Sequence, residues 1–355
     1  MNVLRGFPGL VIDTEWADRV TTGPYDAYTP KQRAALAEAN PYSFLHVTRS
    51  QEDVPTDQRD DIDGLITGCT TAMQRIYDAG AYVAHEEPSL FLYRMEVGDH
   101  SQTGILGVVP VTDSNDRRIL RHESVRPGRA DLLTRHLLEV GMSSSPISLT
   151  YRTDEGLDSV IVSCTAGRPI LESTSEGVHQ TVWAVAGGDA DALIHAMGDR
   201  TLYVTDGHHR LAAAEEARNR VAPTHPDHPL QWTEAVLFPD AEMLVLPFHR
   251  RVGDRAGRSG EAIIEALAKC ESLQARADAE DARPTGPGTV GVYVDGRWFS
   301  LELPPAIGSR AVDRLDVSRL QDGVLAPTFG ITDPGSDPMI DYLPEPVGLA
   351  ALVRR

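Results

Sequence analysis

The chain has 355 residues, 41% of them hydrophobic and 24% charged, which is typical of a globular protein with a sizeable buried core. Its 33 Lys and Arg residues against 52 Asp and Glu residues give a formal net charge of −19, and this negative charge disfavours binding to nucleic acid. We find no apolar run that would span a membrane and no secretory signal, and the cysteines lack metal-ligand spacing, so we expect a cytoplasmic protein with reduced thiols.

The first hundred residues alternate helical and strand-like stretches. Pro30 stands in the first turn of a helix predicted over residues 30–39, and "NPYSFLHV" (residues 40–47) is typical of a turn followed by a strand. Apolar residues at helical intervals predict a second helix over residues 63–80, and "SLFLYRMEV" (residues 89–97) predicts a strand.

The middle of the chain mixes helices and strands. We expect helices over residues 130–142 and 189–197, where apolar residues recur with the helical period. Strands are predicted over residues 104–111, 146–151, 158–165 and 181–186. This order of elements favours an α/β or α+β core.

The last third of the sequence begins after a Pro-rich polar stretch, residues 221–229, which is typical of a surface loop. The stretch "TVGVYVDGRWFSLEL" (residues 289–303) predicts a hairpin, because Asp295-Gly296 separates two alternating strands. The other expected elements are strands over residues 233–238 and 243–248, a helix over 260–273, and a polar linker over 275–288.

We expect three segments along the chain. An N-terminal α/β segment would cover residues 1–103, a phosphate-binding core residues 104–220, and a C-terminal α+β region residues 230–355. The core would then contain the most informative motif of the sequence.

That motif is "LYVTDGHHRLAAAEEARNR" (residues 202–220), which places cations in the first turn of a helix, where acids are usually preferred. A strand, a glycine turn and a helix N-terminus together suit phosphate, because the glycine lets the backbone approach and the helix N–H groups point at the anion. Asp206 would hold a divalent cation such as Mg²⁺. The residues expected to contact phosphate are Gly207, His208, His209 and Arg210. Spacing alone favours Asp206 as a helix N-cap before a solvated first turn over a phosphate site.

Arginines gather in a second stretch, residues 117–129, which is the one basic cluster of this acidic sequence. Such a cluster is usually a solvated face, but it also suits a local funnel for a nucleotide or an acidic substrate. Its members are Arg117, Arg118, Arg121, Arg126 and Arg129.

The turn "DGHHR" resembles the phosphate-binding turn of the ParB/sulfiredoxin-like superfamily, and in particular that of the ADP-dependent free-serine kinases. The whole chain resembles a large bacterial family classed as a domain of unknown function. The matching pieces are "GPYDAY", "NPYSFLHV", "SLFLYRM", "ILRHESVRPGRADLLTRHLLE", "SPISLTY", "LYVTDGHHRLAAA", "VLPFHRRV" and "LDVSRLQDGVLAPTFGI". The resemblance implies an α/β fold with a ParB-like mixed-sheet core and additions at both ends.

In the serine kinases a glutamate directly after a histidine deprotonates the serine hydroxyl, and the matching pair here is His122-Glu123. The resemblance therefore implies that Glu123 is the general base, while His208 and His209 stabilise the transferring phosphoryl group. Without the resemblance, the sequence favours Glu123 as part of an exposed charged turn.

The resemblance also implies the ligands. The donor would be ADP or ATP with Mg²⁺, and the acceptor would be the hydroxyl of a small metabolite such as free L-serine. The residues implied are Arg126 and Arg129 for the nucleotide, and His122, His249 and Arg250 for the substrate.

Two other functions fit parts of the sequence. The relatives close with a Pro-Lys-Ser/Thr-Thr-like segment that this chain lacks, which favours a non-catalytic nucleotide-binding module acting through a protein partner. A metal-dependent hydrolase would use His122, His208, His209 and His249 as ligands, although neighbouring residues on a helix point about 100° apart. Sulfinic-acid repair is excluded, because His208 stands where those enzymes carry a cysteine.

Overall fold

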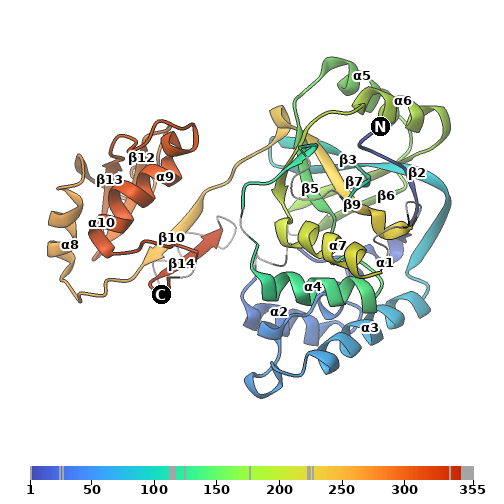
Figure 1. The fold of residues 1–355 in the computed structure, drawn as a ribbon, viewed down its shortest axis with the longest axis horizontal. Helices are drawn as coiled ribbons and strands as arrows, with labels where there is room; N and C mark the ends of the chain where they lie inside the picture. The colour runs from blue at the N-terminus through green and yellow to red at the C-terminus, as the bar shows by residue number, and fades with distance from the viewer. Residues whose placement is uncertain are drawn as a thin grey trace. The chain divides into compact units, whose positions relative to one another are not determined.

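The structure, a computed structural model, describes residues 2–344 except 24, 26, 27, 112–116, 124, 176, 222–224, 226, 227 and 336. The chain divides into two compact units, Met1–Leu244 and Val245–Arg355, each with a hydrophobic core of its own. Both units combine helices with sheets, so the expected mixed α/β fold class is confirmed (Figure 1). Among the described residues, no helix is both long and apolar enough to span a membrane.

A mixed sheet organises the first unit. Its strands follow the order β4-β8-β5-β9-β3-β2-β7-β6, and β1 pairs with β2 outside this path. The pairs β4–β8 and β5–β9 are parallel, and the other pairs are antiparallel. The strands are β1 (Phe7–Ile12), β2 (Tyr82–Val97), β3 (His100–Pro110), β4 (Ile119–Leu120), β5 (Ile147–Tyr151), β6 (Leu171–Ser175), β7 (Val178–Val185), β8 (Leu202–Asp206) and β9 (Trp232–Pro239). This one sheet takes strands from all three segments expected from the sequence.

Helices pack on the sheet of the first unit, with α5 and α6 near one end and α4 and α7 side by side elsewhere (Figure 1). The α-helices are α1 (Thr14–Val20), α2 (Pro30–Ala39), α3 (Ile62–Asp78), α4 (Pro127–Glu139), α5 (Glu155–Thr165), α6 (Gly187–Met197) and α7 (His208–Val221). Short 3₁₀ helices cover Phe44–His46, Gln51–Asp53, Thr56–Gln58, Pro229–Gln231 and Asp240–Glu242.

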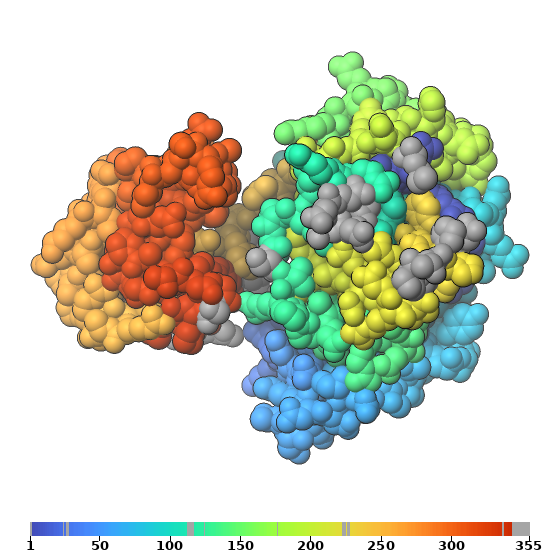
Figure 2. Space-filling view, in the orientation of Figure 1, coloured from blue at the N-terminus to red at the C-terminus, as the bar shows by residue number. Residues whose placement is uncertain are grey.

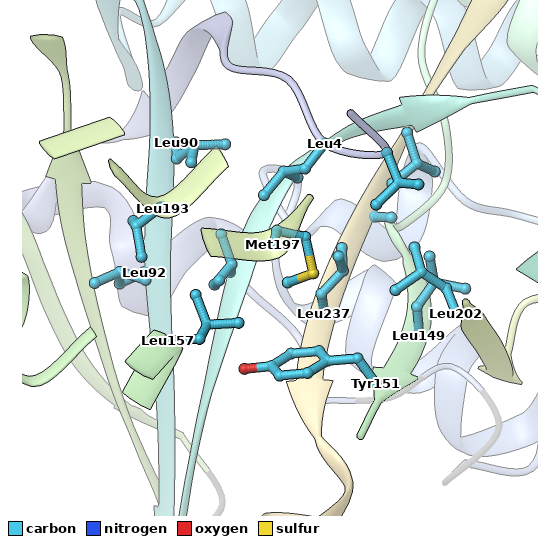
Figure 3. Close-up of a cluster of buried hydrophobic side chains, with 14 of the residues drawn as sticks. Leu4, Leu90, Leu92, Leu149, Tyr151, Leu157, Leu193, Met197, Leu202 and Leu237 are labelled. Atoms are coloured by element: carbon cyan, nitrogen blue, oxygen red, sulfur yellow. The ribbon is translucent and has the colours of Figure 1, made fainter. Parts of the chain in front are cut away.

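The core of the first unit lies between the sheet and its helices (Figure 3). Residues on β5 alternate between buried and half-buried, as a strand with one face in the core requires. Leu149 of β5, Leu202 of β8 and Leu237 of β9 are all fully buried, so β8, which leads to the glycine turn, and its neighbours β5 and β9 are held by a shared apolar layer.

The second unit contains two smaller sheets. The predicted hairpin is present, and Asp295 and Gly296 adopt positive φ values of 49° and 78° in its two-residue turn. Its strands are β10 (Phe248–Val252) paired with β14 (Ile340–Pro344), and β11 (Leu273–Arg276), β13 (Arg297–Glu302) and β12 (Thr289–Val294) in that order. Its helices are α8 (Gly260–Leu267), the 3₁₀ helix Val312–Arg314, α9 (Asp316–Leu320), the π-helix Gln321–Leu325 and α10 (Ala326–Phe329).

Three predicted strands are wrong. Residues 158–165 belong to α5, because Asp154 caps the helix by accepting the Leu157 N–H, and Leu157 and Ile161 bury one face. Residues 40–47 form turns and a 3₁₀ helix. Within residues 243–248 only Phe248 is in a strand.

Candidate functional site

The predicted strand, glycine turn and helix are present as β8, Gly207 and α7. Gly207 has a φ of +97°, a conformation that residues with a Cβ rarely adopt. A Cβ at this position would also lie 3.2 Å from the guanidinium carbon of Arg210. The sharp turn therefore depends on glycine, and it brings the first turn of α7 directly to the end of β8.

The segment 121–126, between β4 and α4, lies at the same end of the sheet. β4 and β8 are parallel neighbours, so the residues that follow both strands emerge at one edge. α4 then packs beside α7, and the two helices lie next to each other on the face shown in Figure 2, α4 in green and α7 in yellow. The topology thus explains why two motifs about eighty residues apart in the sequence meet.

His208 is the centre of this contact. Its side chain is only 1% exposed, and its Nε2 accepts the backbone N–H of His122 at 3.3 Å. Its Nδ1 lies 3.3 Å from Oε2 of Glu123. Since a neutral imidazole has one N–H and one acceptor nitrogen, accepting at Nε2 leaves the proton on Nδ1, the nitrogen that faces the Glu123 carboxylate. The ring of His122 packs edge-on against that of His208, with 4.4 Å between the ring centroids.

His209 holds the other end of the same segment. Its Nε2 accepts the backbone N–H of Arg126 at 3.1 Å. Burial lowers the pKa of both His208 and His209, and the positive charges of Arg129 and Arg126 lower the pKa of His209 further, while Glu123 opposes the shift. The two rings are therefore neutral near pH 7, as their acceptor roles require.

An ion pair fixes the start of the segment. Arg121 donates two hydrogen bonds to Glu215 of α7, at 2.6 and 2.8 Å, and the side chains are 16% and 17% exposed. Glu215 follows His208 by two helical turns, so both lie on the face of α7 that meets residues 121–126. Side chains of α7 thus hold Arg121, the His122 N–H and the Arg126 N–H.

Arg210 and Asp206 pair with each other in this structure. The Arg210 guanidinium also donates to the carbonyl oxygens of Ser145, at 3.1 Å, and Pro146, and to the Ser145 hydroxyl. These contacts tie the start of β5 to the glycine turn. Phosphate at Arg210, or Mg²⁺ at Asp206, would compete with this ion pair.

The remaining predicted residues lie in two places. Arg126 and Arg129 are exposed near the start of α4, beside the anchored segment. His249 and Arg250 lie on β10 and belong to the second unit. The structure therefore brings together the residues expected around Glu123 and His208.

A metal centre fits this arrangement poorly. Ligand atoms of His122, Glu123 and His208 lie within 4.8 Å of one another, which is the one such group among the described residues. Both ring nitrogens of His208 are engaged, however, and a metal on Nδ1 would move the proton to Nε2, where it would face the His122 N–H. The hydrogen bond at Nε2 and the contact at Nδ1 instead favour a neutral histidine beside the carboxylate.

Sequence reasoning missed three contributors to the site, Ser145, Pro146 and Glu215. The Ser-Pro pair directly precedes β5, and β5 runs antiparallel to β8, so its start lies beside the end of β8. Glu215 stands seven residues after His208, which is the helical spacing for one face. This spacing could have predicted that Glu215 lies on the same face of α7 as His208, but nothing in the sequence indicated that its partner is Arg121.

The fold and the site define a mixed α/β protein with a glycine turn at a helix N-terminus and a histidine-held carboxylate beside it. The chain belongs to the family described as Protein of unknown function (DUF1015), whose model matches residues 4–318. Membership of a domain-of-unknown-function family is thereby confirmed. Searches of curated proteins and of solved structures found no match.

Proposed function

We propose that this protein is a kinase-like phosphotransferase with a ParB-like core, which moves a phosphoryl group from ADP or ATP to the hydroxyl of a small metabolite such as free L-serine. The observation that carries the proposal is the Glu123 carboxylate, held 3.3 Å from the buried His208 ring at the amino end of α7. The proposed base, Glu123, and the N-terminus of α7, which suits an anion, therefore lie at the same edge of the sheet.

The nucleotide phosphates suit the glycine turn. The N–H groups at the start of α7 and the positive end of its dipole favour an anion, and Gly207 adds no side chain that would keep one from the backbone. The Arg210 guanidinium lies beside Gly207, where it would meet the anion. The exposed Arg126 and Arg129 add positive charge nearby. Mg²⁺ would enter with the nucleotide and offset its charge, and Asp206 would reach the metal only after releasing Arg210.

The acceptor hydroxyl suits Glu123. Its side chain is 59% exposed, so a small substrate can reach the carboxylate. The hydroxyl proton passes to Glu123 as the oxygen bonds to the terminal phosphorus of the nucleotide, and the bond from that phosphorus to the bridging oxygen breaks. Because His208 is neutral, its Nδ1, 3.3 Å from the carboxylate, would orient Glu123 without neutralising it. The three cysteines are free, which suits a cytoplasmic enzyme.

The test compares wild type with Glu123→Gln in phosphoryl-transfer assays that offer ADP or ATP, Mg²⁺ and a panel of small hydroxyl compounds. Removing the base should lower kcat by about 10²- to 10⁴-fold. The midpoint shift that nucleotide produces in thermal melting should stay at the wild-type value, because Glu123 does not hold the phosphates.

Glu172→Gln is the matched control, since Glu172 is exposed on β6, at the far edge of the same sheet. It should behave as wild type. Nucleotide binding without turnover on any acceptor would favour the non-catalytic module instead. Full activity in Glu123→Gln would refute the assignment of the base.

A further inference from the structure

We infer that His208 is a positioning residue, held as the Nδ1–H tautomer by the His122 backbone N–H, and that it fixes the orientation of the Glu123 carboxylate. The inference rests on the proposed function only in that it takes Glu123 as the general base. It differs from the role expected from the sequence, in which His208 would contact the transferring phosphoryl group.

The donor and acceptor pattern carries the assignment. A backbone N–H can only donate, so the 3.3 Å contact from His122 requires a lone pair on Nε2 of His208. That leaves the proton of the neutral ring on Nδ1, which lies 3.3 Å from Oε2 of Glu123, and an ionised carboxylate can only accept, so a proton on this nitrogen favours the contact. One tautomer satisfies both neighbours, and the reverse tautomer would satisfy neither.

Because His208 is buried, it is poorly placed to contact a transferring phosphoryl group directly. Its side chain is 1% exposed and the ring of His122 packs edge-on against it, whereas the carboxylate it contacts is on an exposed side chain. The protein therefore presents Glu123 to solvent and keeps the ring that orients it inside. Active sites often have this arrangement, in which a buried residue, here His208, orients the exposed residue that reacts, here Glu123.

The surrounding contacts keep this relation in place. The Arg121–Glu215 pair holds the chain immediately before His122, and His209 holds the Arg126 N–H beyond Glu123. Residues that α7 holds therefore flank Glu123 on both sides, which favours the orientation imposed by His208.

The first measurement is direct and needs no substrate. Long-range ¹H–¹⁵N spectra of ¹⁵N-histidine-labelled protein near pH 7.5 report which ring nitrogen carries the proton. We expect His208 as the Nδ1–H form, and His195, which is exposed on α6, as the averaged mixture of a solvated ring. An Nε2–H or averaged His208 would overturn the inference.

The second measurement compares His208→Asn with His208→Gln. The asparagine amide reaches the position of Nδ1 and keeps a donor for Glu123, while the glutamine amide reaches toward Nε2 and loses it. For an active substrate pair, we expect kcat in His208→Gln to fall about 10- to 100-fold with KM changed less than about twofold, and His208→Asn to recover part of this loss.

The two measurements separate the inference from the proposed function. If no acceptor is phosphorylated but His208 has the Nδ1–H form, the positioning contact stands and the kinase proposal fails. If Glu123→Gln abolishes turnover but His208 is averaged between tautomers, the kinase proposal stands and the positioning role fails. Equal losses of kcat in the two His208 variants, with both folded by circular dichroism, would also contradict the positioning role.

Discussion

Gly207 shows at the scale of one residue how backbone geometry creates the site. Its φ of +97° disfavours a side chain, and so does the 3.2 Å that would separate a Cβ at this position from the Arg210 guanidinium carbon. We expect Gly207→Ala to lower the free energy of unfolding by about 1–3 kcal/mol, the usual strain of such a backbone conformation. Urea denaturation measures this change.

Gly128 provides the control for that substitution. It lies in the first turn of α4, and a Cβ there would meet nothing within 4 Å. Gly128→Ala should leave stability unchanged or raise it by up to about 1 kcal/mol, because alanine favours the helix. If Gly207→Ala were as harmless as Gly128→Ala, the turn would tolerate side chains and the argument for a glycine-dependent phosphate site would be lost.

At the scale of elements, the Arg121–Glu215 pair links the segment after β4 to α7. The pair is largely shielded from water, at 16% and 17% exposure, and has two hydrogen bonds. Glu215→Gln removes the negative charge that Arg121 meets and should cost about 1–3 kcal/mol in thermal or urea unfolding.

The neighbouring Glu216 is the matched comparison on the same helix. It pairs with Arg220 at 2.8 Å, but the two side chains are 49% and 41% exposed, so water screens their attraction. Glu216→Gln should change stability by no more than about 0.5 kcal/mol. Similar effects of the two substitutions would show that the Arg121 pair does not anchor the segment.

The elements themselves were largely predictable where the sequence has a clear period or a turn signal. The helix at 63–80, the hairpin around Asp295-Gly296 and the strand–turn–helix at Gly207 all correspond to structure. The β-branched run 158–165 was wrongly predicted as a strand. It forms part of α5, because Asp154 caps the helix and one face of the helix packs on the core.

The site was predictable only in part. The resemblance implied that Glu123 and His208 belong to one site, as base and phosphoryl contact, but the direct 3.3 Å contact between them was not expected. The use of Arg210 to hold Ser145 and Pro146 was not predictable, since it depends on β5 lying antiparallel to β8, and no local pattern in the sequence encodes strand order.

At the scale of the whole molecule, each compact unit folds around its own apolar core. Leu149 is fully buried at the centre of the first, and Leu301 is fully buried in the second, among Leu267, Leu303 and Val324. Domains with separate cores open separately unless a large apolar interface couples them. Glu123 and the His208 ring that it contacts both belong to the first unit.

We therefore expect Leu149→Ala and Leu301→Ala each to lower the free energy of unfolding of their own unit by about 2–5 kcal/mol, because each leaves a cavity in a packed core. In hydrogen exchange followed by mass spectrometry, Leu149→Ala should speed exchange in β5, β8 and β9, and peptides of β11, β12 and β13 should exchange as in wild type. Leu301→Ala should give the reverse pattern and leave any nucleotide-induced melting shift of the first unit intact. Faster exchange throughout the first sheet in Leu301→Ala would instead mean that the two cores open as one cooperative unit, and that the proposed site depends on the whole chain.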